Sequence, residues 1–280
     1  MEKLKLKLTK TKNFEDFLSW CKVKNLRKPT VNSYILAWDM FNRIYDGEIE
    51  DIDQSDVNAF VLETHKRVKP TTVNQYLRHL RAIFNYFELP VKVKLLRYDY
   101  EPKVPYTKSE LTKLLVKPDL KTESFLTYRN WVIVNLLLAT GARANTIVNI
   151  KVEDVDLDDY FITFTTLKNR RTKRLPIPAV LVDILRECIN YRNGKPDDYL
   201  FCNSYGAKST VNDLYHTMCD FSQSRGVEKT GLHRFRHTFA KEFMLNGGGH
   251  PEPATYANTL YNRANKAVYQ SVRCRYTEHD

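Results

Sequence analysis

The stretch from Trp131 to Ala139 constrains the fold of this chain more than any other segment. Its residues are apolar apart from Asn135. A helix on a protein surface keeps a polar face, so a helix that is apolar on all sides is expected inside a core. The sequence therefore predicts a buried central helix, which leads directly into the short run from Thr140 to Arg143.

The first hundred residues show apolar residues at helical spacing in four stretches. Asp53 or Ser55 can cap the third of these helices, and Gly47 is predicted to end the second. The stretches are Phe14 to Cys21, Val31 to Ile44, Val57 to Val61 and Val73 to Phe84. We therefore expect a helical domain over residues 1–90.

Residues 91–105 lose this periodicity. Pro102 and Pro105 interrupt any helix there, and Lys92, Lys94, Arg97 and Lys103 supply positive charge. We interpret residues 91–105 as a basic linker to a second domain over residues 106–248, followed by an atypical tail over residues 249–280.

The second domain is predicted to be mainly helical with one small antiparallel sheet. Thr107 and Glu110 fit the capping box of a first helix. Residues 160–165 are rich in aromatic and β-branched side chains, residues 167–174 are basic, and residues 175–178 resume an extended pattern, which indicates a strand, a turn and a strand. Helices are expected again at residues 181–189 and 211–221. The fold class is therefore mainly α.

The charge balance favours a polyanionic partner. The chain has 44 basic and 33 acidic residues, a net charge of +11 and a pI near 9.3, although a basic surface also serves solubility. No apolar run of membrane-spanning length and no signal-peptide core is present, so we expect a cytoplasmic protein without a membrane partner. The five cysteines are scattered without a paired motif, which predicts neither disulfides nor a metal site.

A Lys-Pro-Thr sequence occurs twice, each time at the start of a predicted helix. Lys28 and Thr30 belong to the first copy, and Lys69 and Thr71 to the second. A cation beside the free N–H groups of a helix start suits a phosphate, so these residues are candidate DNA contacts. The alternative is that each copy is an ordinary helix start with a solvated lysine.

Four residues have the chemistry needed to handle a phosphodiester. Arg143 and Arg236 can bind its non-bridging oxygens, because a guanidinium stays charged and offers paired donors. His233 lies three residues before Arg236, on the same face of a helix. Lys168, in the basic turn, can reach a minor groove or donate a proton to the leaving oxygen. Singly, each residue could instead be a helix-end, turn or cap residue.

Taken together, these segments resemble the tyrosine recombinase (phage integrase) family over nearly the whole chain. Residues 140–155 resemble the first arginine box of that family, and Lys168 followed by Pro176 resembles its hairpin lysine. The run from Gly231 to Ala240, with His233, Arg236 and His237, is similar to its His-x-x-Arg-His box. The helical first domain resembles the SAM-like core-binding domain.

The resemblance implies that two domains close around double-stranded DNA. It implies site-specific cleavage through a 3′-phosphotyrosine and rejoining to another strand, by a homo-tetramer, without a metal or nucleotide cofactor. Arg143, Lys168, His233 and Arg236 would be catalytic. The expected DNA contacts are Lys28, Thr30, Lys69, Thr71, Arg170, Arg171 and Lys173.

The chain departs from the family pattern at two places. Thr146 stands where the family usually has an acidic residue. Counted from Arg236, the family's second His or Trp falls at Thr259 and its nucleophilic Tyr at Val268. The nucleophile is therefore not found at its expected position.

Back-translation suggests a reason for the missing tyrosine. Read one base later, codons can encode His at position 259 and Tyr at position 268, so we hypothesise that the reading frame is lost near Gly248. The alternative is a divergent tail with Tyr269 or Tyr276 as a displaced nucleophile. A recombinase remnant that binds DNA without cleaving it is the competing function, and an RNA-binding protein is disfavoured because no stacking-aromatic RNA motif is present.

Overall fold

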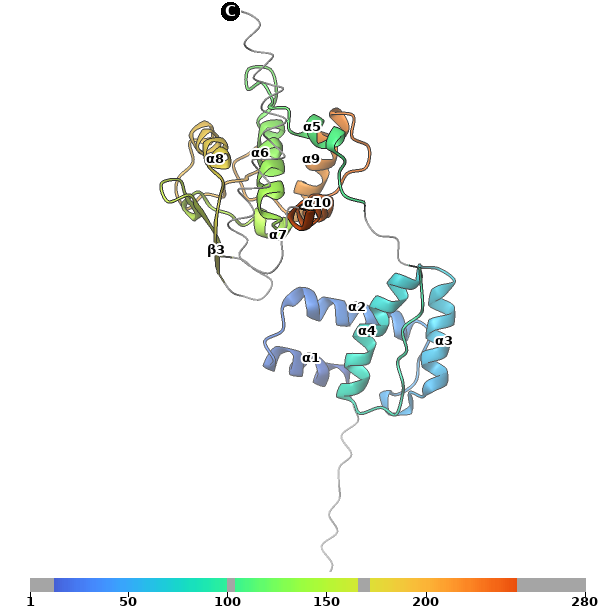
Figure 1. Cartoon of the computed structure of the whole chain (residues 1–280). Helices are drawn as coiled ribbons and strands as arrows, with labels where there is room; N and C mark the ends of the chain where they lie inside the picture. The colour runs from blue at the N-terminus through green and yellow to red at the C-terminus, as the bar shows by residue number, and fades with distance from the viewer. Residues whose placement is uncertain (1–12, 100–103, 166–171, 246–280) are drawn as a thin grey trace, which may run out of the picture. The chain divides into compact units, whose positions relative to one another are not determined.

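The computed structural model describes residues 13–99, 104–165 and 172–245 of the 280-residue chain. The chain divides into an N-terminal unit, Met1–Glu101, and a C-terminal unit, Pro102–Asp280 (Figure 1). Both are mainly helical, and one small antiparallel sheet lies in the C-terminal unit, so the predicted fold class is confirmed. Within the described residues no helix is both long and apolar enough to cross a membrane.

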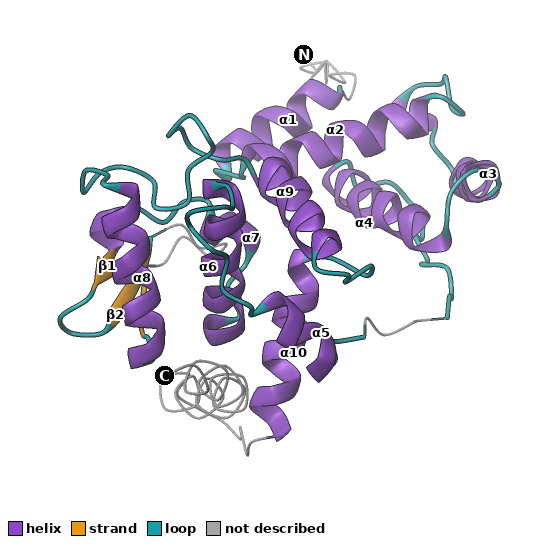
Figure 2. Ribbon diagram, turned by 90° about the horizontal axis from the view of Figure 1, so that it is seen from above, coloured by secondary structure: helices purple, strands orange, loops and turns teal. Residues whose placement is uncertain are grey.

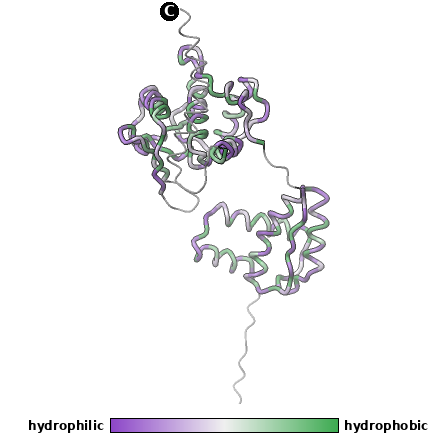
Figure 3. The backbone as a smooth tube through the Cα atoms, viewed as in Figure 1, coloured by the Kyte–Doolittle hydropathy of each residue, from purple (hydrophilic) through white to green (hydrophobic). Residues whose placement is uncertain are grey.

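In residues 13–99 the N-terminal unit is a bundle of four α-helices around an aromatic core. Phe41 lies at its centre, with its ring 5.6 Å from that of Phe60 and 5.4 Å from that of Phe84. Figure 3 shows hydrophobic and hydrophilic segments interspersed along these helices, as expected for helices with one buried face. The elements are α1 (Phe14–Val23), α2 (Lys28–Asn42), the 3₁₀ turn η1 (Ile49–Asp51), α3 (Gln54–His65) and α4 (Pro70–Tyr86).

Helix starts in this unit follow the sequence signals, and one helix end does not. Asp53 caps α3, since its carboxylate accepts the N–H groups of Ser55 and Asp56. The predicted stop of α2 at Gly47 is wrong, because the helix ends at Asn42. After the helix the N–H groups of Ile44 and Tyr45 both donate to the carbonyl of Phe41, and the hydroxyl of Tyr45 donates to the carbonyl of Glu48, 2.8 Å away, in the turn that follows.

The first part of the predicted linker packs on the N-terminal unit. Val91, Val93 and Leu96 are half-buried against its core. The buried amide of Asn74 on α4 accepts from the N–H of Leu96 at 2.7 Å and donates to its carbonyl at 2.9 Å. Residues 91–96, the first part of the predicted linker, therefore form a strap on the bundle.

The C-terminal unit is built around α6 (Phe125–Thr140), which packs on α8, α9 and α10 (Figure 2). All residues from Tyr128 to Leu137, and Ala139, are buried, which confirms the predicted central helix. The other elements are α5 (Lys108–Leu114), α7 (Ala144–Ile147), the 3₁₀ turn η2 (Val152–Asp154), β1 (Val155–Asp156), β2 (Phe161–Phe164), β3 (Lys173–Pro176), α8 (Ala179–Arg192), α9 (Val211–Ser224) and α10 (Leu232–Leu245).

The sheet has the order β1-β2-β3 with antiparallel neighbours. It contains a strand, β1, that the pattern did not indicate, and β3 begins at Lys173, within the predicted turn. Arg174 pairs with Thr163 in the register. Its guanidinium lies 4.2 Å from the centre of the Phe161 ring and 2.9 Å from a carboxylate oxygen of Asp156, so a basic residue is accommodated on an exposed strand.

Arg129 ties α6 to its neighbours through a buried network without a carboxylate. Its five N–H groups donate to the side chains of Asn130, Ser209 and Thr217 and to the carbonyl of Cys202, at distances of 2.7 to 3.2 Å. Only 1% of the residue is exposed. Burial lowers the pKa of this guanidinium to about 10, so it stays charged at neutral pH. The network fixes α9 and residues 202–209 against α6.

We predict that Asn74→Ala destabilises the N-terminal unit by about 2 to 3 kcal/mol, because it leaves both backbone groups of Leu96 unpaired. Urea unfolding and hydrogen exchange at the Leu96 amide measure the effect. Asn85→Ala is the matched control, since Asn85 is an exposed residue of the same helix. Equal effects of the two substitutions would contradict the assigned role of Asn74.

Candidate active site

The central helix α6 ends in a geometry that presents Arg143. Gly141 terminates the helix in the left-handed region, with φ of 58°, a conformation that glycine adopts without cost. The hydroxyl of Thr140 donates to the carbonyl of Leu136 at 2.7 Å, which orders the last turn. Arg143 follows in an extended conformation at the start of α7, with its side chain exposed.

Helix α10 carries the second arginine to the same place. Phe235 and Thr238 are buried and fix the helix in the core, whereas His233 and Arg236 lie on its exposed face, as their spacing predicts. The guanidinium of Arg236 donates to the carbonyl of Gly141, the left-handed residue that ends α6. The structure therefore brings the two predicted arginine motifs together at the C-terminal end of α6.

The electrostatics of this place favour an anion. Partial burial and the charge of Arg143 both lower the pKa of Arg236, with burial the larger cause. Among the described residues, no carboxylate pairs with either guanidinium. Two cations that repel each other without a counter-ion gain stability when an anion binds between them.

Of the remaining predicted catalytic residues, the described part of the chain includes His233 but not Lys168 or Tyr269. His233 lies one helical turn before Arg236 on α10. Lys168, Arg170, Arg171 and Tyr269 lie outside the described residues, so their roles stay predictions. Lys173 is exposed at the first position of β3, on the hairpin whose other strand is β2.

The two Lys-Pro-Thr sequences begin helices, as predicted. Lys28 is the first residue of α2, and Lys69 stands at the N-cap position of α4 without a side-chain capping bond. The two lysines supply positive charge at these helix starts. The helix starts offer fewer free N–H groups than expected. Proline has none, and the N–H groups of Thr30 and Thr72 donate to the carbonyls of Arg27 and Lys69.

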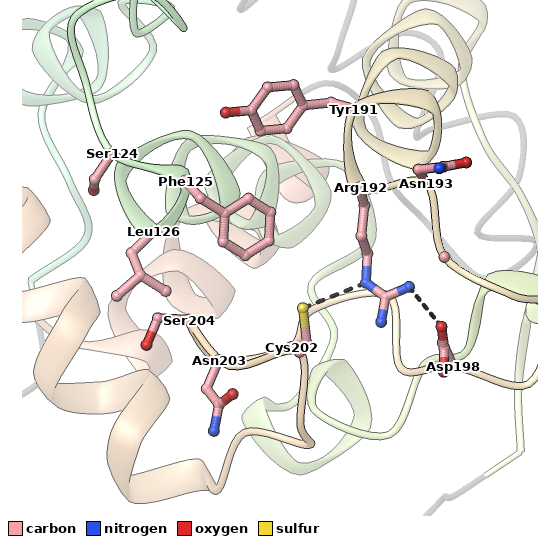
Figure 4. A pocket seen from close by; sticks show the side chains of 12 residues that line it. Ser124, Phe125, Leu126, Tyr191, Arg192, Asn193, Asp198, Cys202, Asn203 and Ser204 are labelled. Carbon is pink, nitrogen blue, oxygen red and sulfur yellow. Dashed lines mark hydrogen bonds and ion pairs between the residues drawn. The ribbon is translucent and has the colours of Figure 1, made fainter.

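An open cleft of about 580 Å³ lies at the other end of α6, between the start of that helix, the end of α8 and residues 198–206. It contains none of the predicted site residues. Figure 4 shows Arg192 inside it, held by Asp198 at 3.3 Å and by the sulfur of Cys202 at 3.3 Å. Arg192 is thus already paired with a carboxylate, whereas near Gly141 no carboxylate of the described residues pairs with Arg143 or Arg236.

Comparison with known families identifies the class of protein. The model of the phage integrase family matches residues 106–252, more than half of the chain. The model of the N-terminal SAM-like domain of phage integrases matches residues 14–89. The chain therefore belongs to the phage integrase family, and the resemblance read from its motifs is confirmed.

Individual relatives agree with this assignment. A tyrosine recombinase of Pseudothermotoga lettingae is 25% identical over 253 residues, which cover 84% of each chain. Tyrosine recombinase XerC of Bacillus licheniformis is 26% identical over 86% of each chain. The integrase of Escherichia phage 186 is 29% identical over 65% of this chain and 51% of its own length.

Solved structures share the fold. The Tn1549 transposon integrase, in complex with transposon right end DNA, has a TM-score of 0.69 at 18% identity and covers 93% of this chain and 98% of its own. A lambda integrase tetramer bound to a Holliday junction has a TM-score of 0.64 at 12% identity, over 82% of this chain and 71% of its own. Identities this low establish similarity of fold.

We predict that Gly141→Ala destabilises the C-terminal unit by about 2 to 4 kcal/mol. A methyl group at this position is strained by the positive φ and also overlaps the ring of Phe239 on α10. Gly206→Ala is the matched control, because its φ is 79° and nothing lies within 4 Å of the added carbon. Urea unfolding should show a loss larger than that of the control by about 1 to 3 kcal/mol, and equal losses would contradict the close packing of α10 on the end of α6.

Proposed function

We propose that this chain is a site-specific DNA recombinase that cuts and rejoins DNA through a 3′-phosphotyrosine. The observation that carries the proposal is the pair of Arg143 and Arg236 at the end of α6, without a carboxylate partner in the described part of the chain. Its family membership supports the same activity.

The proposed chemistry assigns each arginine to the scissile phosphate. Arg143 and Arg236 bind its non-bridging oxygens and stabilise the charge that grows on them in the transition state. His233 donates a hydrogen bond to the same phosphate, and Lys168 supplies the proton that the departing 5′ oxygen takes up. A tyrosine hydroxyl attacks the phosphorus, so one phosphodiester replaces another and no nucleotide cofactor is needed.

Duplex DNA is the proposed partner of both units. The net charge of +11 favours a polyanion, and Lys28, Thr30, Lys69 and Thr71 stand at two helix starts of the N-terminal unit. Lys173, at the start of β3, is a further candidate contact, and Arg170 and Arg171, which lie outside the described residues, stay candidates from the sequence. Lambda integrase, which shares the fold, is bound to DNA as a dimer in one solved structure and as a tetramer in another, which supports a homo-tetramer on DNA.

Val268 stands where the family pattern places the nucleophilic tyrosine. The match to the phage integrase family ends at residue 252, before Thr259 and Val268. This is in keeping with a reading frame lost near Gly248, and sequencing the gene across codons 246–270 tests that hypothesis. Tyr269 is the candidate within the chain as it stands.

We predict a covalent protein–DNA adduct on a nicked suicide substrate. Duplexes selected by binding from a random pool are synthesised with single nicks at successive positions, and the adduct is detected by denaturing electrophoresis. Mass spectrometry of the DNA-linked peptide identifies the tyrosine. Arg236→Ala is expected to reduce adduct formation by about a hundred- to a thousand-fold, because one oxyanion donor is lost.

Arg186→Ala is the matched control, since Arg186 is an exposed arginine of α8 that pairs with Asp183. It should form the adduct at the rate of the unaltered protein. A mobility shift without an adduct in the unaltered protein would instead identify a DNA-binding protein that does not cleave. A preference for single-stranded RNA over duplex DNA in competition would overturn the proposed substrate.

A further inference from the structure

Arg234 lies between the two proposed catalytic residues of α10 and faces away from them. Its guanidinium donates to both carboxylate oxygens of Glu110, at 2.9 and 3.0 Å. It also donates to the carbonyls of Val104 at 2.9 Å and Pro105 at 3.2 Å, and to that of Lys229. All five N–H groups of this side chain are therefore bonded, and only 12% of the side chain is exposed.

Glu110 connects this arginine to the start of α5, which Figure 2 shows beside α10. The same carboxylate accepts the N–H of Thr107 at 2.7 Å and completes the capping box of α5. Burial alone would raise the pKa of Glu110, but the hydrogen bonds from Thr107 and Arg234 outweigh it and lower the pKa. The carboxylate is thus charged at neutral pH and shared by two helix starts.

Tyr106 completes the contact between the connecting segment and α10. Its ring lies 4.1 Å from the Arg234 guanidinium carbon and 4.6 Å from the centre of the Phe235 ring. Its N–H donates to the hydroxyl of Thr238 at 2.9 Å, and that hydroxyl donates to the carbonyl of Arg234. Each of the residues 104–106 is therefore bonded to α10.

These residues form one structure, the linker anchor, which consists of Val104, Pro105, Tyr106, Glu110, Arg234 and Thr238. The described part of the C-terminal unit begins with Val104, so the linker anchor lies where the chain arrives from the N-terminal unit. Nothing in the sequence pattern singles out Arg234, because its partner Glu110 is 124 residues away.

We propose that Arg234 is a positioning residue that fixes the first turns of α10, and with them His233 and Arg236, to the connection between the two units. The inference rests on the proposed function, because it gives Arg234 a part in cleavage. His233 and Arg236 adjoin Arg234 in the helix, so a shift of the anchor displaces the groups that bind the phosphate. A displacement of about 1 Å at such groups costs on the order of a hundred-fold in rate.

The first test is hydrogen exchange on the full chain, which does not depend on cleavage. Arg234→Met keeps much of the side-chain volume and removes all five donors. We expect the amide of Tyr106 and those of residues 235–238 to lose protection together. Loss of protection in α10 alone, or in neither segment, would overturn the anchor.

The second test compares cleavage with binding. Arg234→Met should form the suicide-substrate adduct about ten- to a hundred-fold more slowly, with the dissociation constant for the duplex changed by no more than about threefold. Glu110→Gln should show the same pattern to a smaller degree, because it keeps the shape of Glu110 and weakens the ion pair. Unchanged cleavage in a folded Arg234→Met protein would refute the positioning role.

Arg225→Met is the matched control. Arg225 is equally buried, with 12% of its side chain exposed, lies 4.5 Å from the Phe221 ring centre, and approaches Glu123 only to 3.9 Å. It is expected to lower thermal stability while leaving the cleavage rate of the folded protein unchanged. Equal slowing by Arg225→Met would assign the effect to general destabilisation and overturn the proposal. If the unaltered protein forms no adduct, the proposed function fails and hydrogen exchange alone decides the anchor.

Discussion

The burial of α6 is the constraint on which the C-terminal unit depends. Because α8, α9 and α10 all pack on this helix, its last residue defines a fixed point in the core. Gly141 stops the helix there and leaves no room for a side chain against Phe239 of α10. The same close approach lets Arg236 reach the carbonyl of Gly141, so core packing and the placement of the two arginines have one cause.

Burial and, after it, the charge of Arg143 lower the pKa of Arg236, and among the described residues no carboxylate pairs with either guanidinium. Arg129 and Arg234 show the opposite arrangement, in which five N–H groups are all bonded within the protein. Saturated donors suit arginines that hold the fold, as Arg129 and Arg234 do, whereas Arg143 and Arg236 are proposed to use their donors on a phosphate.

Local signals in the sequence were sufficient for much of this structure. The apolar run in α6 predicts its burial, and Asp53 and Thr107 predict the starts of α3 and α5, because capping involves residues within one turn. The spacing of His233 and Arg236 likewise predicts their shared face. The strap held by Asn74 and the bond between Arg234 and Glu110 could not be predicted, because each joins residues far apart in the chain and only folding brings them together.

The contacts that hold α10 against α6 all lie in the described part of that helix. Phe235 and Thr238 fix the helix in the core, and Arg236 completes the arginine pair, all before residue 246. Within the described part of the chain, the contacts that place Arg236 beside Gly141 are therefore made before residue 246. If, as hypothesised, the reading frame is lost near Gly248, every altered residue follows these contacts, so the hypothesis predicts that phosphate binding is retained while strand cleavage is lost.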